Sequence, residues 1–197
     1  MKKGRIEAFS DGVIAIIITI MVLELKVPHA SEFNDVLALW PVFLSYVLSF
    51  VYVGIYWNNH HHLFVVVNKV NGGVLWANMH LLFWLSMVPF ATAWMGENHF
   101  APAPVALYGF VLLMDGVAYS ILTRQLISHH GDDSVLAKAV GSGIKGKLSV
   151  ACYALAIGAS FYEVWISGAF YVFVALMWLI PDKRIEKTLN EAQGASD

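Results

Sequence analysis

The chain has 197 residues, of which 58% are hydrophobic and 13% are charged, and its formal net charge at pH 7 is -2. A soluble domain carries about 25% charged residues, so this composition is typical of a membrane protein. The small negative charge argues against a nucleic-acid partner, and the single cysteine excludes an internal disulfide framework.

Six apolar segments follow one another along the chain. A helix that crosses a bilayer needs about 20 mostly apolar residues. The candidate spans lie at about residues 9–25, 36–56, 74–95, 105–127, 148–162 and 164–180. The fifth is the shortest, and only Glu163 separates it from the sixth. The sequence therefore predicts an all-α, integral membrane protein with six transmembrane helices.

The basic residues predict the orientation of these spans, because Lys and Arg accumulate in cytoplasmic loops. With the N terminus in the cytoplasm, 11 of the 12 basic residues fall in inner segments, and only Lys26 lies outside. An even number of spans then places the C terminus in the cytoplasm too. We expect residues 1–181 to form a single six-helix domain in a bacterial or archaeal inner membrane, with a short cytoplasmic tail at 182–197.

The first apolar segment, "GRIEAFSDGVIAIIITIMVLEL", has charged residues at one end and one hydroxyl, Thr19, in its apolar run. At 3.6 residues per turn, one stripe of this helix consists of Phe9, Gly12, Ile16, Thr19, Ile20 and Leu23. Ser10 and Asp11 point away from it.

Two interpretations of this stripe are open. Helical spacing of Ile and Leu by itself favours packing in a bundle. Asp11 would then pair with Arg5 or a histidine, and Thr19 would bond back to a carbonyl. Alternatively the stripe lines a pore, in which rings of Ile and Leu form a constriction that gates by dewetting.

Three motifs resemble one family. "RIEAFSDGV" carries R-x-x-x-F-S-D, "YWNNHHHLF" carries W-x-N-H-H-x-L-F, and "WANMHLLFWLSMVPFATAWMGE" is similar to the pattern of a third span. Together they resemble the endosomal and lysosomal potassium channel family (the transmembrane protein 175 type). The likeness covers most of residues 4–110, although His62 stands where relatives often carry Arg. The matching residues are Arg5, Phe9, Ser10, Asp11, Trp57, Asn59, His60, His61, Leu63, Phe64, Trp76, Asn78, Pro89, Phe90, Thr92 and Tyr108.

This resemblance implies a homotetramer in membrane lipid, with a central pore lined by the first helix of each subunit. Such channels conduct K+ without a TVGYG filter, and the sequence has no such motif. By position, the resemblance places the constriction at Ile16, Ile20 and Leu23, with Thr19 as a polar layer.

The resemblance also implies a polar network behind the pore. Arg5, Ser10 and Asp11 would hold the first helix against the second and third spans. The candidate partners are His60, His61 and Asn78. No cofactor is implied beyond the permeant K+ and other monovalent cations, and no nucleophile–base pair points to an enzyme.

Other ionisable residues leave alternatives open. Glu24 is either a cation-concentrating ring at the outer mouth or a solvated rim charge. Asp115 lies within a span, which makes it a functional-site hypothesis, set against a pair with Arg124 or a bond to a Trp or Tyr. Adjacent histidines on a helix point about 100° apart, so His60, His61 and His62 do not easily converge on one metal ion.

The predicted function is a potassium-preferring cation channel. A proton-coupled secondary transporter that uses Asp11, Asp115 and the histidines is the alternative. A membrane haem or metal redox protein is a third class.

Overall fold

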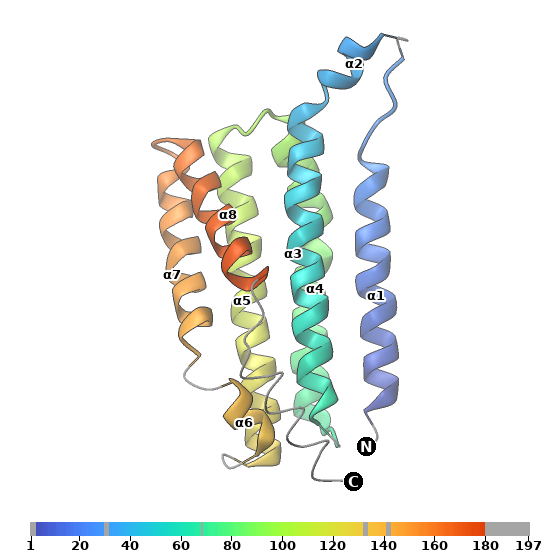
Figure 1. Ribbon diagram of the computed structural model, residues 1–197, viewed down its shortest axis with the longest axis vertical. Helices are drawn as coiled ribbons and strands as arrows, with labels where there is room; N and C mark the ends of the chain where they lie inside the picture. Colours follow the sequence, from blue (N-terminus) through green and yellow to red (C-terminus); the bar gives the residue numbers. More distant parts are fainter. Residues whose placement is uncertain (1–2, 30–31, 68, 132–133, 141–142, 180–197) are drawn as a thin grey trace.

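The computed structural model describes residues 3–29, 32–67, 69–131, 134–140 and 143–179. Within these ranges every element of regular secondary structure is an α-helix, which confirms the predicted all-α class (Figure 1). The predicted tail at 182–197 lies outside the described residues. The helices are α1 (Gly4–Leu23), α2 (Phe33–Leu37), α3 (Trp40–Val65), α4 (Gly72–Glu97), α5 (Pro102–His130), α6 (Val135–Val140), α7 (Ile144–Ala159) and α8 (Val164–Leu179).

Four helices are long and apolar enough to cross a membrane. They are α1, α3, α4 and α5, with 20 to 29 residues and mean hydropathies of 1.4 to 2.1 in their most apolar windows. α7 and α8 have 16 residues each, or about 24 Å at a rise of about 1.5 Å per residue, which is shorter than a typical hydrocarbon core. The chain is a multi-pass membrane protein, and the count of six spans stays a prediction.

The second span begins and ends later than the sequence predicts. Residues 33–37 form the separate short helix α2, whose start is closed by a capping box between Glu32 and Asp35. α3 begins at Trp40 with a proline in its first turn, where the missing N–H costs nothing. It continues to Val65 through the polar stretch at 57–62, and this extension carries His60 to a buried position.

The helices are arranged around α3, α4 and α5. α1 packs against α3 and α4, whereas α7 packs against α5 and α8. In Figure 1, α1 therefore lies at one side of the molecule and α7 and α8 at the other, with α3 and α4 between them. This arrangement leaves α1 with neighbours on only one face.

Buried tyrosines tie the second half of the bundle together. Tyr52 Oη donates to the carbonyl of Tyr171 at 2.6 Å, and Tyr171 Oη donates to the carbonyl of Val105 at 3.0 Å. Tyr108 Oη lies 3.0 Å from Ser49 Oγ. These hydroxyls are therefore paired, as buried polar groups must be.

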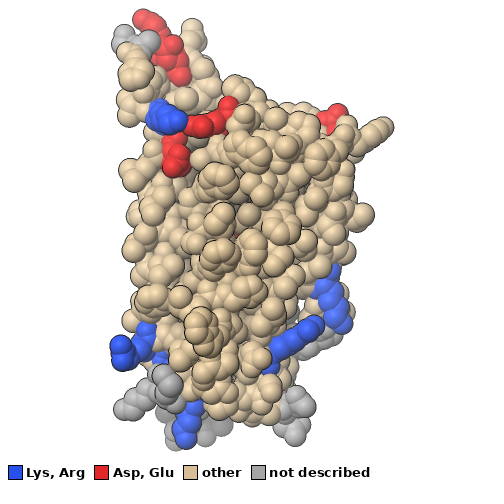
Figure 2. Space-filling view, turned by 180° about the vertical axis from the view of Figure 1, so that it is seen from behind, with Lys and Arg blue, Asp and Glu red and all other residues tan. Residues whose placement is uncertain are grey.

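The charged side chains separate by sign along the long axis of the molecule. Figure 2 shows most of the Lys and Arg side chains at one end, with the Asp and Glu side chains and one basic side chain at the other and an uncharged band between them. The first turn of α1 lies at this basic end (Figures 1 and 2). This distribution is what the positive-inside rule predicts for a cytoplasmic N terminus.

Gly109 marks a close approach between α5 and α8. A Cβ added there would lie 2.9 Å from Cζ of Tyr171, closer than a side chain can tolerate, whereas at Gly116 the nearest atom is 3.8 Å away. Overpacking costs about 1–3 kcal/mol. We expect Gly109→Ala to be less stable than Gly116→Ala by about this amount in thermal unfolding of the purified protein. Equal stability of the two variants would contradict the close approach.

Candidate pore helix

One face of α1 is packed against the bundle. Its buried residues recur every three or four positions and meet α3 and α4: Ile6, Ser10, Ile14, Ile17 and Met21. This is the spacing that places side chains on one face of a helix. The stripe that was considered as a pore lining is on the other side of the helix.

The opposite face of α1 is apolar and uncovered in the single chain. The exposed fraction is 57% for Ile16, 43% for Ile20 and 75% for Leu23. α1 is also the least buried of the four long helices. The four predicted pore residues therefore share the face that the subunit itself does not cover.

Thr19 lies on this uncovered face, and its hydroxyl is already bonded within the helix. Thr19 Oγ1 donates to the carbonyl of Ile16 at 2.9 Å. A hydroxyl has one hydrogen and two acceptor lone pairs. The bond uses the hydrogen, so the oxygen keeps a lone pair that can point outward toward a cation. The back-bond expected for a bundle helix and the exposure expected for a pore layer therefore occur together.

A groove of about 620 Å³ lies between α1 and α4 on this side of the subunit. Ile16 and Ile20 line it from α1, and Pro89 and Phe90 line it from α4. Its wall also includes Glu24 and Glu97. The groove borders the predicted constriction.

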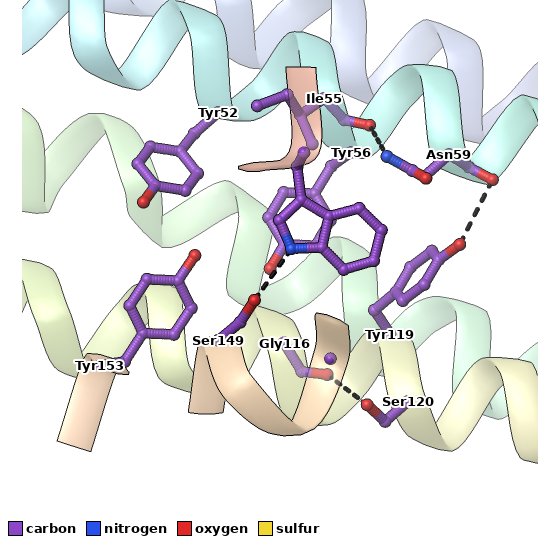
Figure 3. Close-up of a pocket in the computed structure, with 11 residues that line it drawn as sticks. Tyr52, Ile55, Tyr56, Asn59, Gly116, Tyr119, Ser120, Ser149 and Tyr153 are labelled. Atoms are coloured by element: carbon purple, nitrogen blue, oxygen red, sulfur yellow. Dashed lines mark hydrogen bonds between the residues drawn. The ribbon is translucent and has the colours of Figure 1, made fainter. Parts of the chain in front are cut away.

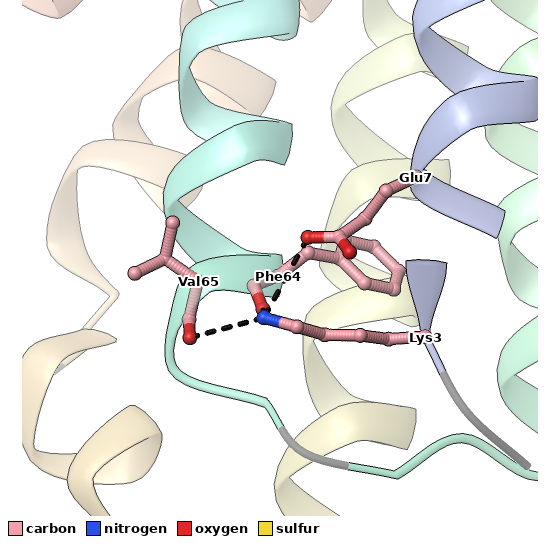
Figure 4. Close-up of polar contacts among 4 residues, drawn as sticks. All are labelled: Lys3, Glu7, Phe64 and Val65. Atoms are coloured by element: carbon pink, nitrogen blue, oxygen red, sulfur yellow. Dashed lines mark hydrogen bonds and ion pairs between the residues drawn. The ribbon is translucent and has the colours of Figure 1, made fainter. Parts of the chain in front are cut away.

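The N-terminal end of α1 is anchored to the C-terminal end of α3. Lys3 Nζ donates to the carbonyl of Phe64 and, at 3.2 Å, to that of Val65, and it lies 3.6 Å from Glu7 Oε1 (Figure 4). The last carbonyls of a helix have no partner within the helix and carry its negative dipole end. Lys3 supplies hydrogen-bond donors to these carbonyls and a positive charge beside the negative end of the dipole. The sequence analysis had not singled out this residue.

This anchor can be tested at the first turn of α1. Lys3→Met keeps most of the aliphatic stem but removes the charge and the donors, which is worth about 1 kcal/mol. We expect backbone amides of this turn to exchange roughly fivefold faster in hydrogen-exchange mass spectrometry. Arg5→Met is the matched control, because Arg5 is exposed and has no polar partner within the described residues. Equal exchange in both variants would contradict an anchoring role for Lys3.

The middle of α1 is tied to the bundle by a chain of three buried polar side chains. Asn78 Nδ2 donates to Ser10 Oγ at 2.9 Å, and Asn78 Oδ1 lies 2.8 Å from His60 Nε2. All three side chains are at most 1% exposed. The chain links α1, α4 and α3 in turn. Three residues are thus brought together out of the seven predicted as a network, which are Arg5, Phe9, Ser10, Asp11, His60, His61 and Asn78.

The remaining residues of that proposed network have other surroundings. Asp11 Oδ1 accepts a hydrogen bond of 3.0 Å from Trp57 Nε1, and the ring of His61 stacks on Trp57. The expected pairing of Asp11 with Arg5 or a histidine is therefore wrong. The sequence analysis noted Trp57 only as part of the W-x-N-H-H motif. Its place in the same motif as His60 and His61 was the signal that could have indicated a bond to Asp11. Arg5 and Phe9 are exposed.

Just beyond the C-terminal end of α1, the chain forms an ion pair with α4. Lys26 Nζ donates to Glu97 Oε1. This hydrogen bond, together with the charges of Glu97 and Glu24, raises the pKa of Lys26 above its usual value. A raised pKa means that the pair persists through neutral pH and is lost only as the pH rises beyond the usual range of lysine. Glu24 thus shares its surroundings with a cation and a second carboxylate.

Asp115 is fully buried in α5, and neither of its carboxylate oxygens has a hydrogen-bond partner within the described chain. The expected pair with Arg124, or a bond to a Trp or Tyr, is therefore wrong. Across the same residues, no group of three or more His, Cys, Asp or Glu side chains is placed to hold a metal ion.

The geometry so far defines a class: an all-helical, multi-pass membrane protein whose first helix is anchored on one face and uncovered on the other.

Comparison with known proteins identifies the family within this class. The sequence model of the endosomal/lysosomal potassium channel TMEM175 matches residues 5–89. A potassium channel of Chryseobacterium sp. is 58% identical over 191 residues, which cover 97% of this chain and 100% of that protein.

Two further relatives extend the comparison. The crystal structure of a lysosomal potassium-selective channel TMEM175 homolog from Chamaesiphon minutus superposes with a TM-score of 0.78 at 30% identity, covering 90% of this chain and 96% of that chain. The human endosomal/lysosomal proton channel TMEM175 is 34% identical over 103 residues, which is 46% of this chain and 20% of that protein. The chain belongs to the TMEM175 family. Its family consists of channels, not enzymes.

Proposed function

We propose that the protein is a potassium-preferring cation channel, in which four copies surround a pore lined by α1. The observation that carries this proposal is the uncovered apolar stripe of α1, set against an opposite face held by Ser10 and two ends held by Lys3 and Lys26. A helix held so firmly on one side presents its other side in a fixed orientation. Four such helices would enclose a narrow apolar path.

The constriction would consist of Ile16, Ile20 and Leu23. Rings of such side chains exclude water at a small radius, so they oppose ions until the path widens. Thr19 lies between Ile16 and Ile20 and would give each dehydrating cation a ring of hydroxyl oxygens. Glu24 would lie just beyond the constriction, where a ring of carboxylates attracts cations.

The preference for K+ rests on the relatives. The Chryseobacterium protein is named a potassium channel, and the Chamaesiphon structure is described as potassium-selective. Na+ and other monovalent cations are the natural competitors for the same path. No cofactor enters this proposal.

The channel would lie in the inner membrane of a prokaryotic cell, with its basic end toward the cytoplasm. The charge separation in Figure 2 supports this orientation. Residues 1–181 would form one transmembrane domain, with α7 and α8 as the fifth and sixth spans and residues 182–197 as a cytoplasmic tail. The groove between α1 and α4 would be covered by a neighbouring subunit.

Ion flux through purified protein in liposomes tests this function. A K+ gradient, with a proton ionophore to balance charge, should drive flux well above that of empty vesicles. Replacing K+ by Na+ should reduce it. A folded tetramer without flux of either ion would overturn the channel proposal.

A proton-coupled transporter is the second candidate, because Asp115 is a buried carboxyl group without a hydrogen-bond partner among the described residues. Such a transporter would show saturable flux that follows the pH gradient and is lost in Asp115→Asn. Channel flux would instead survive this substitution, since Asp115 lies on α5, which packs mainly against α4 and α7, whereas α1 packs against α3 and α4.

A further inference from the structure

Asp115 is unusual in that nothing in the described structure compensates its burial. Its exposed fraction is 0%, and both carboxylate oxygens lack a hydrogen-bond donor. The ion pairs between Lys3 and Glu7 and between Lys26 and Glu97 do not include it. An isolated buried carboxylate is very costly, whereas the neutral acid is not. The position therefore favours a bound proton.

The titratable groups around Asp115 are neutral tyrosines that come from several helices. Tyr56 of α3, Tyr108 of α5 and Tyr153 of α7 are near enough for a charge on Asp115 to act on them. Tyr171 of α8 packs against Tyr108 and Tyr153. On α4, His80 Nε2 accepts from Trp84 Nε1 instead. None of these side chains supplies a positive charge.

A small cavity lies next to this part of α5, and two of the tyrosines on which a charge at Asp115 acts, Tyr56 and Tyr153, line it. Its volume is about 40 Å³, and it is lined by Gly116, the residue after Asp115, together with Tyr56, Tyr119 and Tyr153. A water molecule needs roughly 10–15 Å³ of such space and two to four polar partners. Hydroxyl groups of Tyr52 and Tyr153 point toward one another across this region (Figure 3). The cavity therefore has room for about three or four waters.

The cavity extends toward the basic end of the molecule. Gly146 and Ser149, from the first turns of α7, line it there, and Trp178 of α8 donates from Nε1 to Ser149 Oγ at 2.9 Å (Figure 3). Gly146 is only half-buried, and Lys147 beside it is exposed. Water can thus approach from this end of the bundle.

We propose that Asp115 is a proton-binding site within each subunit, separate from the α1 stripe, and that its proton exchanges with water through the cavity beside Gly146. The side chain is a neutral carboxylic acid in the folded protein. Loss of the proton would leave a charge among α3, α5, α7 and α8, so proton release is coupled to loosening of this half of the bundle. This inference does not depend on which ion the pore conducts.

Infrared spectroscopy of the full chain in liposomes tests the bound proton, because a neutral carboxylic acid absorbs apart from a carboxylate. At neutral pH we expect a carboxylic-acid band that shifts when aspartate is isotope-labelled and disappears in Asp115→Asn. Glu163→Gln, which removes an exposed acid, should leave the band unchanged. The isotope shift needs no substitution, so it remains informative if Asp115→Asn does not fold.

The access route is tested by transfer into heavy water. The Asp115 band should shift within the time of solvent exchange in the wild type and at least tenfold more slowly in Gly146→Val, whose added side chain would occupy the mouth of the cavity. Gly158→Val is the matched control, since it lies on α7 outside the cavity and also has open space at its Cβ.

Three outcomes would overturn the proposal. The first is a band independent of Asp115. The second is a band that appears only when Na+ and K+ are removed, which would assign a metal-cation site. The third is equal exchange in Gly146→Val and Gly158→Val, which would refute access through the cavity. None of these readouts depends on ion flux, so failure of the channel proposal would be seen separately.

Discussion

Ile16→Asn should raise K+ flux about tenfold or more, or reduce the preference for K+ over Na+. Among the residues of the predicted constriction, Ile16 lies nearest the N-terminal end of α1, and its exposed fraction in the subunit is 57%. Four asparagines in one ring would hold water where four isoleucines exclude it. Lowering the barrier by about 1.4 kcal/mol suffices for a tenfold change. Proteoliposome flux with K+ and with Na+ measures both effects.

The matched control is Val22→Asn. Val22 lies on the same helix and is 45% exposed, but it points about 120° away from Ile16 around the helix axis. It should leave flux and ion preference unchanged while making the same chemical change. If neither variant differs from the wild type, Ile16 does not line the conduction path. If both raise flux equally, the effect is not specific to the stripe.

The long apolar helices were the most predictable part of the fold. The predicted spans at 74–95 and 105–127 agree with α4 and α5 to within three residues at each end. Runs of this length and apolar content have few alternatives to a spanning helix. The fold class and the family resemblance were likewise accessible from the sequence.

The end of α3 was not predictable from hydropathy, because the polar residues at 57–62 end the apolar run on which the predicted span was based. Tertiary contacts decide this segment: His60 is buried against Asn78, and Asn59 Nδ2 donates back to the carbonyl of Ile55. Membrane helices tolerate polar residues when side chains of neighbouring helices form hydrogen bonds with them. A single sequence does not show those partners.

The surroundings of individual side chains were harder still. Asp11 was expected to meet a charged partner, yet it accepts from the indole of Trp57. Asp115 was expected to have a partner and has none among the described residues. Both differences arise because the helices' relative rotation, which hydropathy does not encode, decides which side chains meet. The positions of Ile16, Thr19, Ile20 and Leu23 in a pore stay a prediction, as does the assembly of four copies.

Asn78→Leu should lower the apparent melting temperature by roughly 4–20 °C. Asn78 is the central member of the buried chain, and leucine of similar size keeps the packing but removes both hydrogen bonds. Ser10 and His60 would then be buried without that partner, at a cost of about 1–3 kcal/mol each. Asn58→Leu, at an exposed site on α3, is the control for the same chemical change. A thermal shift assay on purified protein compares the two variants.

A double-mutant cycle separates the network from simple loss of packing. If Asn78 acts on Ser10 through their hydrogen bond, Ser10→Ala should cost clearly less in the Asn78→Leu background than in the wild type. Equal costs would contradict the bond. The same bond joins α1 to α4, so its loss should also free the pore helix to rotate. We therefore expect Asn78→Leu to change ion preference at temperatures where it remains folded, although Asn78 itself faces away from the uncovered stripe.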